Sequence, residues 1–121
     1  MRRSTKVAPS NSIIFVSDPD GGEPPVPVRG PMVLSTPSCI SVGCYPQIDG
    51  ETEIVLGRIG EVDPGDVPSF TGTLETPNRA VVVSTVEEET ILEVPVPETK
   101  TEVRIWLSHP RWPEKVTIGL E

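Results

Sequence analysis

AVVVSTVEEETILEVPV, residues 80–96, gives the strongest indication of fold class in this 121-residue chain. Its two apolar runs are rich in valine, whose branched side chain is stiff and fits the pleated surface of a sheet. A three-residue loop at 87–89 would join the runs into a β-hairpin, with Val82 directly opposite Val94. The other face of that hairpin would set Glu93 against a valine, so we expect the face of Val82 and Val94 to point into the core.

The same preference extends over the whole chain. There are 17 valines and 9 isoleucines, against 6 leucines and 2 alanines, the residues that helices favour. The 15 prolines break both helices and central strands. Because short apolar runs recur between turn signals, the sequence predicts an all-β fold, an antiparallel β-sandwich of about seven to nine short strands. A small, partly open β-barrel is the alternative.

Two other regions carry specific strand predictions. Asp49 and Gly50 lie between two apolar runs, which is a strong hairpin signal and would pair Cys44 with Val55. The proline-rich stretch 24–38 is expected to supply edge strands or extended connections, because proline cannot donate a hydrogen bond to a neighbouring strand.

The last two predicted strands, 102–107 and 115–121, alternate in polarity. One face of each strand carries the apolar side chains that we assign to the core, namely Val103, Ile105, Leu107, Val116, Ile118 and Leu120. Trp106 falls on the opposite, outward face. We therefore expect these two strands to be half-buried.

Charge is distributed unevenly along the chain. The net charge is −8 at pH 7, and Arg2, Arg3 and Lys6 lie in the first six positions, so the remainder carries −11. We expect residues 1–11 to form a flexible basic arm and residues 12–121 to form a single β-sandwich domain. An acidic surface repels phosphate, which argues against direct nucleic-acid binding, and it attracts a basic protein partner. It also keeps a domain soluble without any partner.

Cysteine spacing and hydropathy bear on the compartment. Cys39 and Cys44 would face opposite sides of an extended strand, with Cα atoms roughly 16 Å apart. A disulfide needs about 4.4–6.8 Å, so we expect free thiols in a reducing compartment. The longest apolar runs have four residues, whereas a transmembrane helix needs about 20. A cytoplasmic protein without membrane contact or cofactor is the expectation.

The loop between the last two predicted strands is the strongest binding candidate. It holds His109, Arg111 and Trp112 among two prolines, and Trp106 lies on the preceding strand. Tryptophan and arginine are enriched in binding hot spots, and proline limits the entropy that the loop loses on binding. The alternative is that Trp112 folds back against Trp106 to cap the open end of the sandwich.

Two acidic groups extend this candidate surface. They are Glu61, Asp63 and Asp66 in the predicted long loop 58–69, and Glu87, Glu88 and Glu89 at the hairpin tip. Turn chemistry selects such carboxylates on its own, and their spacing does not match a calcium loop, so we predict no metal site. The tip either contacts a basic partner or is simply solvated and discourages association of sheet edges. A single histidine, with no base beside either cysteine, predicts no catalytic pair.

Together these observations favour a small, acidic, non-catalytic interaction module. Its sharper form is an inhibitor or immunity-type protein that neutralises a basic enzyme such as a nuclease. One alternative is a structural or assembly subunit that adds the segment 24–37 to the sheet edge of a neighbour. A less favoured alternative is a metal-dependent hydrolase that uses Glu61, Asp63 and Asp66. We expect a monomer or a weak homo-oligomer.

Overall fold

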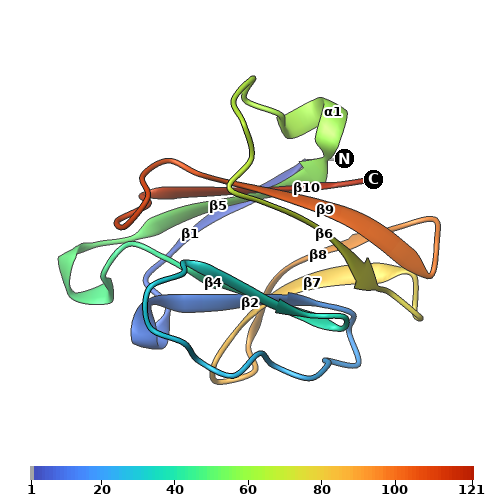
Figure 1. Cartoon of the computed structure of the whole chain (residues 1–121), viewed down its shortest axis with the longest axis horizontal. Coiled ribbons are helices and arrows are strands. Elements are labelled where there is room, and N and C mark those ends of the chain that lie inside the picture. Colours follow the sequence, from blue (N-terminus) through green and yellow to red (C-terminus); the bar gives the residue numbers. More distant parts are fainter. Residues whose placement is uncertain (1) are drawn as a thin grey trace.

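In the computed structural model, which describes residues 2–121, two β-sheets pack face to face (Figure 1). Sheet A has the strand order β1 (Arg3–Val7), β5 (Thr52–Arg58), β10 (Lys115–Leu120), β9 (Lys100–Leu107) and β6 (Phe70–Glu75). Sheet B has the strand order β3 (Val33–Thr36), β4 (Cys39–Gly43), β2 (Ile13–Ser17), β7 (Ala80–Thr85) and β8 (Thr90–Pro95). Neither sheet closes into a barrel. The predicted β-sandwich is therefore confirmed, with ten strands in residues 2–121.

Short connections complete the fold. Neighbouring strands are antiparallel except β5 and β10, which run parallel. Single helical turns follow β1, β4 and β5, namely η1 (Ser10–Ser12), η2 (Gln47–Asp49) and α1 (Ile59–Val62). No helix in residues 2–121 is both long and apolar enough to cross a membrane.

The core lies between the sheets and is almost entirely aliphatic. Alternate residues of the central strands fill it, including Ile14, Val16, Ile54, Leu56, Val103, Ile105, Val116 and Ile118, each with no exposed surface. Each such side chain contributes about 1.5–3 kcal/mol when it leaves water. The inward positions predicted for the last two strands are thus confirmed, with Leu107 packed at the margin of the core.

The hairpin of β7 and β8 forms, but in a different register from the one predicted. Val82 lies opposite Glu93, and Val81 lies opposite Val94. The register shifts after Val83, which places a bulge beside the turn. Because side chains alternate between faces, this slip of one residue brings Val81 and Val83 into the core in place of their neighbours.

The hairpin predicted at Asp49 and Gly50 is wrong. β4 belongs to sheet B and β5 to sheet A, so the intervening segment crosses from one sheet to the other. Gly50 follows the single helical turn η2 and is not the centre of a two-residue turn. The backbone N–H of Tyr45 bonds to a side chain, Thr52 Oγ1 (2.9 Å), and not to the backbone of a hairpin partner. In both β4 and β5, side chains on the two faces of the strand are buried. A hairpin with one face in solvent would leave one of those faces exposed.

The amino-terminal segment differs from the expected flexible arm. Residues Arg3–Val7 form edge strand β1, which pairs with β5. Its backbone hydrogen-bonds to β5, Val7 packs against the core, and Lys6 lies directly opposite Glu53. Opposite charges on facing strand positions favour this pairing by about 0.2–1 kcal/mol.

Both cysteines are free, as predicted, and both are buried. Cys44 belongs to the core cluster, whereas Cys39 lies on the other face of sheet B. Burial raises the pKa of Cys39 to about 11 and that of Cys44 to about 12, although a hydrogen bond with Thr52 acts in the opposite direction on Cys44. Both groups are therefore thiols at neutral pH, and thiols are weak nucleophiles.

Candidate functional site at one end of the sandwich

The loop 108–114 between β9 and β10 holds an exposed tryptophan in a fixed position. His109 Nδ1 accepts hydrogen bonds from the backbone N–H groups of Arg111 (3.1 Å) and Trp112 (3.0 Å). The imidazole also stacks on the Trp112 ring, with centroids 5.2 Å apart and planes 23° apart. Trp112 nevertheless remains 54% exposed. The loop therefore presents this side chain to solvent and does not fold it back as a cap.

Trp106 lies elsewhere and has a packing role. It points outward from β9, as predicted, but the segment between β5 and β6 crosses that face of sheet A and leaves it only 5% exposed. Its Nε1–H donates to the backbone oxygen of Asp66 (2.9 Å). Within residues 2–121 no ring contact joins Trp106 to Trp112. The structure thus brings together three of the four residues proposed from the sequence.

The packing over sheet A depends on Gly119. A Cβ atom at that position would lie 3.0 Å from both Ile59 Cγ1 and Trp106 Cζ3. We expect Gly119→Val to lower the free energy of unfolding by about 1–3 kcal/mol through overpacking. Thermal unfolding measures this loss. The fluorescence emission of Trp106 in a Trp112→Phe background reports whether the segment between β5 and β6, which covers this face of sheet A, is displaced.

A matched control for Gly119 lies in the same covering segment. A Cβ atom on Gly60 would meet nothing within 4 Å. Gly60→Val should therefore shift stability by no more than about 0.5 kcal/mol. Equal melting temperatures for the two variants would contradict the packing described above.

A hollow lined by charged side chains lies at the base of the Trp112 loop. Its volume is about 470 Å³, and its lining comprises Lys6, Glu51, Glu53, Ser108, Glu114 and Lys115. The parallel pairing of β5 with β10 places Lys115 opposite Glu53, whose backbone N–H donates to the Glu114 oxygen (2.8 Å). Three carboxylates thereby gather beside two ammonium groups.

These three glutamates were missed by the sequence analysis. Glu51 and Glu53 stand at the start of one apolar run, and Glu114 stands just before another, 61 positions away from Glu53 in the chain. Each looks like an ordinary solvated strand end. Only the parallel pairing of their strands, which no local pattern indicates, brings them together.

The acidic residues proposed from the sequence divide between different places. Glu87, Glu88 and Glu89 form the tip of the β7–β8 hairpin, where Ser10 Oγ donates to Glu87 Oε1 (2.5 Å). Ser10 follows β1 directly, so this tip lies at the end of the molecule where β5 and β10 begin.

The other three carboxylates lie along the segment that crosses sheet A. Glu61 accepts a hydrogen bond from the Arg58 backbone N–H (3.3 Å), and Asp63 Oδ1 accepts one from Gly65 (2.7 Å). Asp66 offers its backbone oxygen to Trp106. In the part of the chain that is described, no three His, Cys, Asp or Glu side chains are arranged to hold a metal ion.

Exposed apolar side chains accompany Trp112. Ile48, in η2, is 94% exposed, and Val67 is 90% exposed just before β6. The segment that carries Val67 adjoins the end of β9, because Ser69 Oγ accepts a hydrogen bond from the Leu107 N–H (3.4 Å). We define the Trp112 end as the loops 44–51, 66–69, 86–89 and 108–114. Figure 1 shows the loops 44–51 and 108–114 together, on the left. This end combines exposed apolar groups with carboxylates.

Comparison with known proteins gives a likeness of fold. No protein-family model matches the chain, and no curated protein sequence matches it. The crystal structure of ComJ from Bacillus subtilis, described as an inhibitor of the DNA degrading activity of NucA, has a similar fold with a TM-score of 0.66. The likeness covers 98% of this chain and 93% of that one, at 12% sequence identity. At that identity it shows that the two chains share a fold.

Proposed function

We propose that this protein is a non-catalytic inhibitor that binds a basic enzyme, in the first instance a DNA-degrading nuclease, through the Trp112 end. The observation that carries the proposal is Trp112 itself, a half-exposed indole held in place by His109 at an acidic end of the molecule. The likeness to ComJ supports the choice of a nuclease as partner class.

The Trp112 loop has the properties of a binding hot spot. Hot spots are few, are enriched in tryptophan and arginine, and are surrounded by groups that exclude water. Trp112 and Arg111 belong to that class, with Ile48 and Val67 as exposed apolar neighbours at the same end. Because two hydrogen bonds and a ring stack already order the loop, binding costs little further entropy.

Charge complementarity supports a basic partner. The chain carries a net charge of −8, and six of its glutamates lie in or beside the Trp112 end: Glu51, Glu53, Glu87, Glu88, Glu89 and Glu114. An enzyme that acts on DNA presents a positive surface to the phosphate backbone. The acidic end would compete for that surface and accelerate encounter with it.

The alternatives have weaker support. A hydrolase centred on Glu61, Asp63 and Asp66 would need those carboxylates to converge, and within residues 2–121 they do not form a metal-binding group. An assembly role would use β3, which is the edge strand of sheet B formed by part of the proline-rich region. Light scattering distinguishes the two roles. An assembly subunit would form a discrete oligomer, whereas we predict a monomer or a weak homo-oligomer.

The test is inhibition of DNA degradation as a function of salt. We expect the protein to inhibit NucA, or the corresponding nuclease of the organism that encodes this chain, and the affinity to fall about tenfold or more between about 50 mM and 300 mM salt. The double variant Glu51→Gln/Glu114→Gln should bind more weakly and depend less on salt, mainly through a slower association rate.

The matched control removes two charges elsewhere. Glu23→Gln/Glu98→Gln changes the net charge by the same amount, at exposed positions outside the Trp112 end. Equal effects of the two double variants would show that only total charge matters and would refute the assignment of the surface. Absence of inhibition at every salt concentration would refute the nuclease partner.

A further inference from the structure

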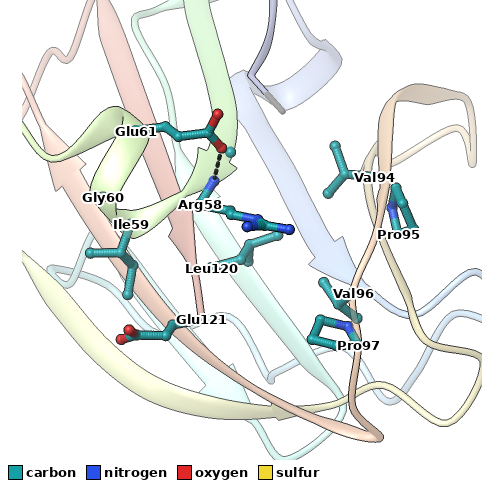
Figure 2. A pocket seen from close by; sticks show the side chains of 11 residues that line it. Arg58, Ile59, Gly60, Glu61, Val94, Pro95, Val96, Pro97, Leu120 and Glu121 are labelled. Carbon is teal, nitrogen blue, oxygen red and sulfur yellow. Dashed lines mark hydrogen bonds between the residues drawn. The ribbon is translucent and has the colours of Figure 1, made fainter.

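A separate cavity of about 440 Å³ lies at the opposite end of the sandwich, where β5, β8 and β10 finish (Figure 2). Its walls are largely apolar, with the side chains of Ile59, Val94, Val96 and Leu120 each less than 9% exposed, and charged residues lie at its rim. The cavity falls within the range of about 300–1,000 Å³ that is typical of small-molecule sites. Its position separates it from the Trp112 end and from the function proposed above.

One cation, the exposed residue Arg58, borders this space. Arg58 ends β5 opposite Leu120 of β10, and Figure 2 shows its guanidinium group extending toward the Val94 and Val96 side of the cavity. Within residues 2–121, no carboxylate forms an ion pair with the Arg58 guanidinium. Arg104 of β9, by contrast, is paired with Glu102 (3.0 Å).

The two carboxylates that also line the cavity, Glu61 and Glu121, are not paired with the Arg58 guanidinium. Glu61 bonds to the backbone N–H of Arg58, as the dashed line in Figure 2 shows. The Glu121 side chain extends away from the Arg58 guanidinium in the same view. The Glu61 charge acts on Arg58 electrostatically, but no ion pair joins it to the guanidinium. An arginine fork at the edge of a largely apolar cavity can bind a carboxylate through two parallel hydrogen bonds.

We propose that this cavity binds a small amphipathic monocarboxylate, an apolar chain or ring that bears one carboxylate group. The apolar part would contact Val94, Val96 and Leu120, and the carboxylate would pair with Arg58. A singly charged head group fits better than a phosphate, because Glu61 and Glu121 line the same cavity and would repel a higher negative charge.

The test uses three probes that share one chain, namely octanoate, octanol and octylammonium. We expect octanoate to raise the melting temperature with increasing concentration and to bind at least about tenfold more tightly than the other two. Arg58→Gln should remove that preference for octanoate, whereas Arg104→Gln, which alters the paired arginine of the same sheet, should leave it unchanged. Methyl NMR shifts of Val94, Val96 and Leu120 on adding octanoate locate the ligand.

Two results would overturn the proposal. The first is equal binding of octanoate and octanol, which would show that Arg58 only covers apolar surface with its methylene groups. The second is a set of NMR shifts that leaves the three cavity residues unaffected. If Arg58→Gln does not fold, Arg58→Lys takes its place, and we expect weakened but selective octanoate binding, because an ammonium group keeps the charge and lacks the fork.

Discussion

Trp112→Ala is expected to weaken binding to the inhibited nuclease by roughly 30- to 1,000-fold, which corresponds to about 2–4 kcal/mol. The indole is the large apolar group that the structure holds ready at the Trp112 end, 54% exposed in the free protein. A partner that covers it would gain the burial of an aromatic ring at little entropic cost, since His109 already orients it. Titration calorimetry or the inhibition constant measures the loss.

Controls separate this effect from a loss of folding. The melting temperature of Trp112→Ala should stay close to that of the parent chain, because the ring is not part of the core. Val26→Ala removes another exposed apolar side chain, 79% exposed and outside the Trp112 end, and should leave binding intact. His109→Ala should give an intermediate loss, since the loop keeps its tryptophan and loses its acceptor. Binding of Trp112→Ala within about twofold of the parent would remove the Trp112 end as the contact surface.

Asp18→Ala is expected to lower the free energy of unfolding by about 2–4 kcal/mol and the melting temperature by roughly 10 °C. Asp18 is only 2% exposed and follows the end of β2. Its carboxylate accepts hydrogen bonds from the backbone N–H of Asn78 (2.8 Å), from Asn78 Nδ2 (2.6 Å) and from the backbone N–H of Asp20 (3.0 Å). The substitution removes the acceptor of the two backbone N–H groups, whereas Asn78 Nδ2 keeps its hydrogen bond to Asp20 (2.7 Å). Urea or thermal unfolding measures the cost.

The pH dependence of this effect has a definite sign. Burial alone would raise the pKa of Asp18, but the hydrogen bonds from Asn78 and Asp20 outweigh it and hold the pKa below its ordinary value. The stabilisation is therefore fully present above about pH 4, the ordinary carboxyl range, and is lost as the pH falls through the lowered folded value. The stability gap between the parent and Asp18→Ala should narrow in acid.

The neighbouring acid provides the control for Asp18. Asp20 is exposed and accepts one side-chain hydrogen bond, from Asn78 Nδ2 (2.7 Å). Asp20→Ala should therefore cost less than about 1 kcal/mol. Equal destabilisation by the two variants, or a gap that widens in acid, would contradict the role assigned to Asp18.

The fold class could be predicted from local sequence features, and the loop 108–114 could be singled out as a candidate, although the exposure of Trp112 was decided by the structure. Branched aliphatic residues in short runs indicate strands, and alternation showed which face of β9 and β10 enters the core. It did not show that Trp106, Thr117 and Gly119 on the other face are buried as well. The loop 108–114 is ordered by groups at most three positions apart in the chain, His109, Arg111 and Trp112. Local signals failed at Asp49 and Gly50, where the chain crosses between sheets although the residues favour a turn.

Composition and alternation were sufficient to predict that this chain forms layered sheets, and local sequence marked the loop 108–114 as a binding candidate without deciding whether Trp112 is exposed or folded back. Both predictions depend on residues close together in the chain. The three-dimensional packing alone decided the hairpin register, the docking of Arg3–Val7, the meeting of Glu53 with Glu114, and the apolar cavity that Arg58 faces. Strand alternation specifies a face but not a neighbour, and the parallel pairing of β5 with β10 joins segments about 60 residues apart, for which no short-range pattern exists.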